Sequence, residues 1–154
     1  MVAVTADGRV CARGGNTHGL LGVEPRGGQP GRPVLVPGPR DVVQVAGGSD
    51  VAYALDRDGT VRAWGRGAGG ALGDGDRQDH ASARPVRVNG LPEIRRIAAH
   101  GLTGYAVDTA GGLWAWGSGL TLGEHASRTA RPVRIPLPGP ALDFSGHHAI
   151  TGTE

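Results

Sequence analysis

The chain has 154 residues, of which 29 are Gly and 11 are Pro, and its formal net charge at pH 7 is only +2. This length suits a single domain, and no apolar stretch reaches the roughly 18 residues of a membrane-spanning helix, so no membrane partner is expected. All basic residues are Arg, scattered along the chain with Arg95-Arg96 as the one adjacent pair; since phosphate-binding surfaces concentrate their cations, we expect no nucleic-acid partner either.

The start of the chain and the absence of a membrane-spanning stretch favour a cytoplasmic location, whereas the cysteine content says little about the compartment. Residues 1–7 lack the charged start and long apolar segment of a secretory signal peptide. The single cysteine, Cys11, excludes an internal disulfide framework.

Three hairpins are predicted along the chain, each formed by two apolar runs around a Gly-containing turn. They span residues 2–14, 52–65 and 104–117. Asp-Gly between β-prone runs is typical of a tight hairpin, because Gly accepts the positive φ of the turn. The turn glycines are Gly8, Gly59 and Gly111, and the closing glycines are Gly14, Gly65 and Gly117.

Three further features follow each hairpin and keep the same phase of about 51 residues, which indicates an internal repeat. They are a Leu-Gly pair, an Arg-Pro-Val triplet and an apolar closing strand. The pairs are Leu21-Gly22, Leu72-Gly73 and Leu122-Gly123; the triplets begin at Arg32, Arg84 and Arg131; the closing strands are 42–45, 94–97 and 141–144. We expect one repeat domain, residues 1–154, with copies at about 2–50, 51–103 and 104–154.

Each copy contains about four short strands and no helical periodicity. Pro in the Arg-Pro-Val strand suits a strand start or an edge, since it lacks an N–H. Residues 52–55 are apolar or small at every position, as expected for a strand covered on both faces. Four-stranded sheets stacked by repetition are propeller blades. The predicted fold class is therefore all-β, a partial β-propeller of three four-stranded blades.

The motifs of the second copy resemble those of the regulator of chromosome condensation repeat family. The resemblance rests on Asp58-Gly59, Trp64-Gly65, Leu72-Gly73, Pro85-Val86 and Ile97-Ala98-Ala99, together with the acidic loop 73–79 and the first-copy stretch 14–22. It implies a propeller that normally has seven blades and that binds other proteins, in some cases small GTPases or chromatin. No residue here matches a nucleotide-exchange element.

The chain departs from the family pattern in several places. Arg13 occupies the position of the expected Trp, Val51 and Thr103 replace a usual His, and the third copy is two residues shorter after Gly117. Three blades cannot close such a ring, so the outermost sheets should expose apolar faces. We expect a second copy or a complementing chain to complete the propeller; a truncated reading frame is the alternative.

Several motifs suggest chemistry but fit the repeat better. Gly65-x-Gly67-x-x-Gly70 matches a dinucleotide-binding pattern, yet a loop follows where a helix is required. Asp74, Asp76 and Asp79 lack the ligand spacing of a calcium loop. The histidines His18, His80, His100, His125, His147 and His148 show no metal-site or catalytic spacing. We expect no catalytic residue, no metal and no cofactor.

The tryptophans divide into two groups. Trp64 and Trp116 occupy equivalent positions of the repeat, which favours core packing between blades over a stacking platform for ligands. Trp114 has no Trp counterpart in the other copies, so we predict that it contacts a partner.

The predicted function is a non-catalytic interaction and regulatory scaffold that binds a protein through loops 15–31, 66–83 and 118–130, which differ between copies. Three alternatives remain: a fragment of a propeller lyase or hydrolase, an exchange-type regulator of a small GTPase, and a surface-recognition inhibitor. The candidate partner contacts are Trp114, His18, Arg66, Asp76 and His125.

Overall fold

The fold is all-β in a computed structural model that describes residues 1–23, 31–118, 128–145 and 148–151. The described residues form thirteen strands and one short 3₁₀ turn, η1 (Ala68–Gly70). No helix in this described part is long and apolar enough to cross a membrane.

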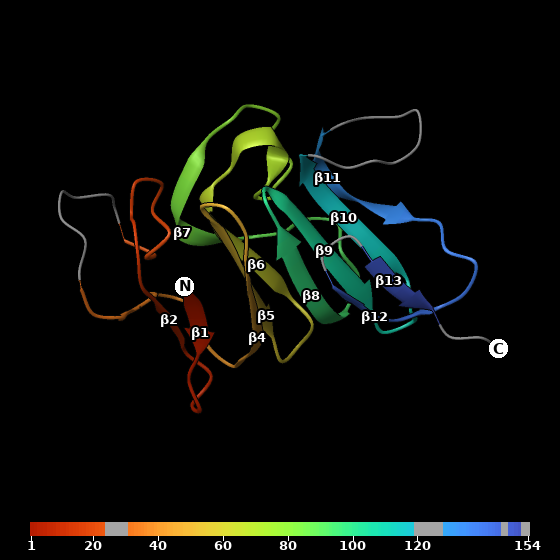
Figure 1. The fold of residues 1–154 in the computed structure, drawn as a ribbon, viewed down its shortest axis with the longest axis horizontal. Coiled ribbons are helices and arrows are strands. Elements are labelled where there is room, and N and C mark those ends of the chain that lie inside the picture. Colours follow the sequence, from red (N-terminus) through yellow and green to blue (C-terminus); the bar gives the residue numbers. More distant parts are fainter. Residues whose placement is uncertain (24–30, 119–127, 146–147, 152–154) are drawn as a thin grey trace.

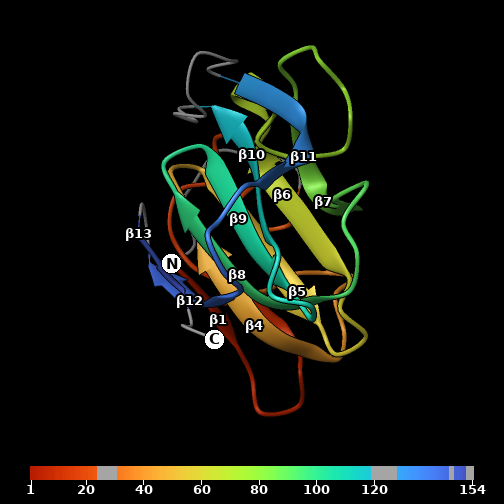
Figure 2. The same cartoon turned by 90° about the vertical axis from the view of Figure 1, so that its right-hand side faces the viewer.

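The strands form antiparallel sheets that follow one another in chain order and lie side by side (Figures 1 and 2). The first sheet contains β1 (Val2–Val4), β2 (Val10–Ala12) and β3 (Val34–Leu35). The second contains β4 (Val42–Gly47), β5 (Val51–Asp56), β6 (Val61–Arg66) and β7 (Ala81–Arg87). The third contains β8 (Ile94–His100), β9 (Thr103–Asp108), β10 (Leu113–Ser118) and β11 (Arg128–Ile135), and the last pairs β12 (Ala141–Ser145) with β13 (His148–Thr151).

The all-β class and the stacked sheets are as expected; of the three expected four-stranded blades, the described residues form two, in the second and third sheets, while the first sheet has three strands and the last has two. The strand that closes each sequence copy pairs with the hairpin that follows it. Thus β4 pairs with β5, and Val45 lies opposite Ala54; β8 pairs with β9, and Ile97 lies opposite Ala106. The connections β4–β5 and β8–β9 are short, which makes antiparallel pairing with the next strand the nearest solution.

The three predicted hairpin turns are confirmed. In each one the turn glycine donates its N–H to a carbonyl three residues earlier: Gly8 to Thr5 at 2.9 Å, Gly59 to Asp56 at 3.0 Å, and Gly111 to Asp108 at 3.1 Å. All three glycines have a positive φ. The Asp-Gly and Ala-Gly turns therefore set the register of the strands on either side. Pro85 lies in β7, an edge strand, as its missing N–H requires.

The hydrophobic core lies between neighbouring sheets. Trp64 and Trp116 are fully buried, which confirms the core prediction. The Trp64 indole N–H donates to the Leu20 carbonyl at 2.9 Å, and the Trp116 indole N–H donates to the Ala71 carbonyl at 3.2 Å. Leu20 and Ala71 each precede the Leu-Gly pair of the preceding repeat. The same bond therefore fastens each four-stranded sheet to the sheet before it.

Tyr53 strengthens the contact between the second and third sheets. Its ring meets Trp116 edge to face, with centroids 5.4 Å apart and planes at 86°. The Tyr53 hydroxyl donates to the Ala71 carbonyl at 2.7 Å, so that carbonyl accepts two bonds from the core. Burial raises the pKa of Tyr53 far above its ordinary value, which keeps the phenol protonated as the donor.

Equivalent glycines allow the loops of one sheet to touch the next sheet. Gly19 and Gly70 both have a positive φ, 79° and 83°. A Cβ at Gly19 would lie 2.6 Å from the Ala83 Cα, and a Cβ at Gly70 would lie 2.6 Å from the Ala130 Cα. Only glycine fits both the backbone conformation and the spacing at these positions.

The first sheet has one covered face and one open face. Val10 and Ala12 are buried against the second sheet. On the opposite face, Cys11 lies across from both Ala3 and Leu35. Ala3 and Leu35 are exposed and Cys11 is half-buried. This face agrees with the expected uncovered apolar surface.

Candidate functional site: a cleft at the loop end of the sheets

The long loop 67–80, between β6 and β7, reaches across to the third sheet. The Gly75 N–H donates to the Ala130 carbonyl of β11 at 2.9 Å. Within its own sheet, the loop is held by Asn89, whose N–H donates to the Gly73 carbonyl at 2.9 Å and whose side chain donates to the Asp74 carbonyl at 2.8 Å. The loop is therefore positioned by backbone bonds on two sheets.

The acidic side chains of this loop are used within the loop itself. Asp74 Oδ1 accepts the Asp76 N–H at 3.1 Å, and Asp76 Oδ1 accepts the Gln78 N–H at 2.9 Å. Asp79 Oδ1 accepts the Gly69 N–H at 2.8 Å. In the described part of the chain, no group of three or more His, Cys, Asp or Glu residues is arranged to hold a metal ion.

His80 ties the two ends of the acidic loop together. Its Nδ1 lies 2.9 Å from the Gln78 carbonyl and its Nε2 lies 2.8 Å from Asp74 Oδ2. Both partners are acceptors, so the bonds favour an imidazolium that donates from both nitrogens. The bond to Gln78 and the neighbouring carboxylates of Asp74 and Asp76 raise the pKa of His80 above its ordinary value.

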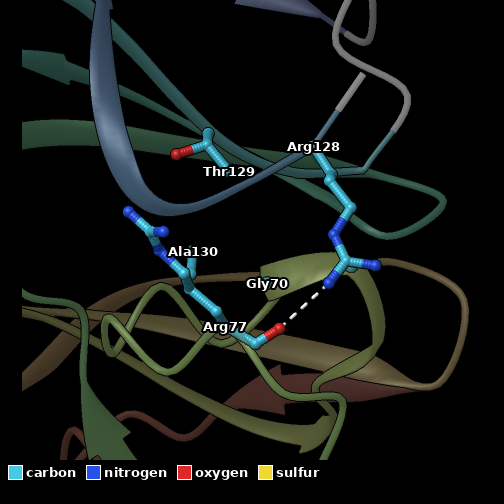
Figure 3. A pocket seen from close by; sticks show the side chains of 6 residues that line it. Gly70, Arg77, Arg128, Thr129 and Ala130 are labelled. Carbon is cyan, nitrogen blue, oxygen red and sulfur yellow. Dashed lines mark hydrogen bonds between the residues drawn. The ribbon is translucent and has the colours of Figure 1, made fainter. Parts of the chain in front are cut away.

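A cleft of about 310 Å³ separates this loop from the start of β11. The residues that line it are Gly69, Gly70, Arg77, Arg128, Thr129 and Ala130. Arg128 extends from β11 toward the loop, and Arg77 extends from the loop toward β11, so the two side chains cross the cleft from opposite walls (Figure 3). Arg128 donates to the Arg77 carbonyl at 2.9 Å and lies 3.9 Å from Asp79 Oδ1. The arrangement can bind an anion, but the lining offers no nucleophile paired with a base.

Two of the predicted contact residues lie next to Asp50. The backbone N–H of Arg66 donates to the Asp50 carbonyl at 2.6 Å, and the side chain of His18 places Nδ1 3.6 Å from Asp50 Oδ2. Arg66 is exposed and His18 is half-exposed. Asp76 lies apart from this pair, in the loop beside the cleft, with an exposed side chain. His125 lies outside the described residues.

Trp114 has a partner within its own sheet. Its indole N–H donates to Asp108 Oδ2 at 2.9 Å, and its side chain is half-buried against the core between the second and third sheets. Arg62 holds the equivalent position in the second sheet, where its Nε donates to Asp56 Oδ2 at 2.9 Å. Trp114 thus replaces Arg62 as the donor to a repeated Asp. Its role as a partner contact, like that of the other candidate residues, stays a prediction.

The sequence prediction missed the two arginines of the cleft. Arg77 and Arg128 are 51 residues apart, and arginines scattered in this way carry no local signal. One feature marks Arg128: it stands three residues before a repeated Arg-Pro-Val triplet, where the equivalent residue of the second copy is Ala81. A comparison of the copies at non-repeated positions would have found it.

Comparison with known proteins identifies the repeats. The model of the "Regulator of chromosome condensation (RCC1) repeat" matches residues 7–55 and 58–105, more than half of the chain, and a second model of the same repeat matches residues 42–70.

Two relatives and one solved structure illustrate the similarity. The human "E3 ubiquitin-protein ligase HERC2" is 33% identical over an alignment of 129 residues that covers 77% of this chain and 2% of that protein. The Xenopus laevis "Regulator of chromosome condensation" is 33% identical over 78 residues, 51% of this chain and 18% of that protein. The crystal structure of Prp20p from Saccharomyces cerevisiae superposes with a TM-score of 0.76 at 26% identity, covering 89% of this chain and 36% of that one.

The chain thus spans only a small part of each of these proteins. Within that part, the repeat match, the sequence identity and the superposition agree with the stacked sheets and their β-propeller arrangement. The chain belongs to the RCC1 repeat family.

Proposed function

We propose that this chain is a protein-interaction module of RCC1 type. The stacked sheets are the framework, and the loops that follow β6 and β10, called the loop end below, bind another protein. The proposal rests on a difference between two parts of each repeat: the residues packed between sheets are equivalent in the copies, whereas the loops are not. Equivalent residues such as Trp64 and Trp116 are buried between sheets in the same way. The loops that follow β6 and β10 differ in sequence and length, and the first of them forms one wall of the arginine-lined cleft.

Relatives support protein partners as a class. Prp20p, whose structure superposes on this chain, has binding properties to Gsp1p and to histones. HERC2 is named as a ubiquitin ligase, but this chain spans only 2% of it, so we do not extend that activity to the chain. A regulatory role without catalysis in this segment, in the cytoplasm, forms part of the proposal.

The proposal also includes completion of the stack by further sheets. The first sheet exposes Ala3 and Leu35 on its open face, and the last described sheet has two strands. Further blades, supplied by a second copy or by another polypeptide, would cover these surfaces as the second sheet covers Val10.

The test compares three immobilised forms of the chain for the proteins they retain. The loop-end variant carries Arg66→Glu and Asp76→Asn, and the control carries Arg57→Glu at the opposite end of the second sheet, where Arg57 is also exposed. Purified Gsp1p and histones serve as named probes beside an extract of the source organism. We expect a protein that binds the wild type and the control but not the loop-end variant. Identical retention by all three forms would contradict binding through the loop end.

A further inference from the structure

The cleft brings together arginines from two sheets. Arg77 lies in the β6–β7 loop, and Arg128 and Arg131 lie on β11. A Cβ on Gly75 would lie 2.9 Å from Arg131 Nε, so the bare backbone of the loop admits this guanidinium. Three guanidinium groups therefore lie in or beside this cleft.

Most donors of these guanidinium groups are not used by the described part of the chain. Arg128 gives one bond to the Arg77 carbonyl, and its nearest carboxylate oxygen is 3.9 Å away on Asp79. Among the described residues, the side chains of Arg77 and Arg131 form no hydrogen bond or ion pair. An anion between Arg77 and Arg128 would use these donors.

Apart from the 3.9 Å ion pair between Asp79 and Arg128, the neighbouring polar groups are engaged elsewhere. Asp79 Oδ1 accepts the Gly69 N–H, and Asp74 Oδ2 is bound to His80. The Thr129 hydroxyl donates to the Arg131 carbonyl at 2.7 Å, so its proton is not offered to the cleft. The guanidinium groups are therefore the donors available to a ligand.

The surroundings select between kinds of anion. A nucleic-acid backbone carries a phosphate every few ångströms and needs a continuous track of cations. Here two arginines, Arg77 and Arg128, line one hollow of about 310 Å³, and Asp76, with an exposed side chain, lies on the adjoining loop. A long polyanion would pass close to that carboxylate. One carboxylate on a flexible segment would enter the hollow and form paired bonds with a planar guanidinium.

We propose that the cleft between the β6–β7 loop and β11 binds a carboxylate from a short acidic segment of a partner protein, held between Arg77 and Arg128. This inference rests on the proposed function as an interaction module, and it names the chemistry by which that module recognises a partner.

The experiment measures binding of a labelled, glutamate-rich peptide to the intact chain by fluorescence anisotropy, with a glutamine-rich peptide of equal length as its control. We expect the glutamate peptide to bind, more weakly as salt is added. We expect Arg77→Gln and Arg128→Gln each to weaken binding by about tenfold, the loss typical of one charge-assisted contact. Arg128→Lys keeps the charge but not the planar fork, and should fall between Arg128→Gln and the wild type.

Arg40→Gln is the matched control, because Arg40 is exposed and far from this loop in sequence. Thermal unfolding of each variant establishes that the fold is retained; Arg77→Gln keeps the backbone carbonyl that Arg128 binds.

Equal binding of both peptides, or equal binding by Arg40→Gln and the cleft variants, would overturn the assignment. Tighter binding of single-stranded DNA or of inorganic phosphate than of the glutamate peptide would also overturn it. If the cleft assignment fails while the loop-end variant still loses its protein, the interaction module stands without this ligand.

Discussion

Asp56 and Asp108 occupy the same position of the repeat, but the pKa of Asp56 is raised and that of Asp108 is lowered. Asp108 Oδ1 accepts the N–H groups of Ala110 and Gly112, and Oδ2 accepts the indole of Trp114. Burial alone would raise its pKa, but these bonds hold the pKa of Asp108 below its ordinary value. A Cβ at Gly112 would lie 2.4 Å from Asp108 Oδ2, so the absent side chain makes this arrangement possible.

Asp56 lacks these backbone donors. Thr60 holds the place of Gly112, and its N–H donates instead to Asp58 Oδ1 at 3.0 Å. Asp56 Oδ1 is buried and has no hydrogen-bond partner among the described residues. Desolvation therefore raises the pKa of Asp56 in spite of its bond to Arg62.

Asn substitutions at these two positions should differ in their effect on stability at pH 7 and on its pH dependence. Asp108→Asn replaces an oxygen acceptor with an NH₂ group and should cost about 1–3 kcal/mol of unfolding free energy at pH 7. Because the folded pKa is lowered, the stability from Asp108 is present above about pH 4 and is lost as pH falls through the folded pKa. Denaturant unfolding from pH 7 to pH 2 should show a smaller acid loss in the variant than in the wild type.

At Asp56 the folded pKa is raised, so stability declines as pH rises from about 4 through the folded pKa. Asp56→Asn removes that decline, and the variant should stay within about 1 kcal/mol of the wild type at pH 7. A larger loss at Asp56 than at Asp108 would show that the Arg62 bond outweighs the burial of the charge.

The sequence predicted residues whose environment is repeated and missed those whose environment is not. The burial of Trp64 and Trp116 followed from their equivalent positions. The partner contact predicted for Trp114 stays a prediction, and its bond to Asp108 could not be foreseen because that bond depends on side-chain geometry. The pairing of Arg128 with the loop around Arg77 depends on contact between sheets, which no local pattern encodes.

At the scale of the elements, one tryptophan in each four-stranded sheet fastens that sheet to a loop of the sheet before it. The ring fills the space between the sheets. Its N–H donates to a backbone carbonyl of the preceding sheet's loop, Leu20 for Trp64 and Ala71 for Trp116. In the first sheet, Arg13 holds this position, and it is exposed. Among the described residues, this tryptophan bond is formed by the second and third sheets.

Two substitutions at Trp64 separate the contributions of ring and N–H. Trp64→Ala should cost about 3–5 kcal/mol because it empties a fully buried site. Trp64→Phe keeps most of the apolar volume and leaves the Leu20 carbonyl without its donor, so we expect a loss of about 1–3 kcal/mol. Urea unfolding followed by circular dichroism measures both, and an unchanged midpoint for Trp64→Ala would show that this contact does not hold the sheets together.

The existence of the strands could be predicted, but their grouping into sheets could not. Turn glycines and apolar runs identified the hairpins, and the 51-residue phase identified the copies. The phase of a repeat does not state which strands share a sheet, since any starting point gives the same period. The pairing of β4 with β5 and of β8 with β9 is fixed by short connections between them.

At the scale of the whole molecule, the sequence repeat and the sheet are staggered. The family matches at 7–55 and 58–105 take in β2 to β5 and β6 to β9, although the last residues of β5 and β9 fall outside them. Each repeat therefore supplies the last two strands of one sheet and the first two of the next. This stagger links neighbouring sheets through the chain itself, so loss of one sheet disrupts the repeats on both sides.

The open face of the first sheet predicts association through that surface. Leu35 is 46% exposed there, and a covering sheet would remove it from water. Light scattering during gel filtration should give a mass above the 15.7 kDa of one chain. Leu35→Asp should lower the measured mass toward one chain, whereas Val43→Asp, a substitution in β4, should not. A mass of one chain at all concentrations would contradict the proposal that a second copy covers this face.

Binding at the loop end, on a framework of sheets that stays unchanged, can be followed by hydrogen exchange of the intact chain with and without the glutamate-rich peptide. We expect slower exchange on peptide binding at the amides of 68–80 and 128–131, with no change in β5 or β9. Protection concentrated instead in the first and last sheets, at 2–12 and 141–151, would contradict binding at the loop end.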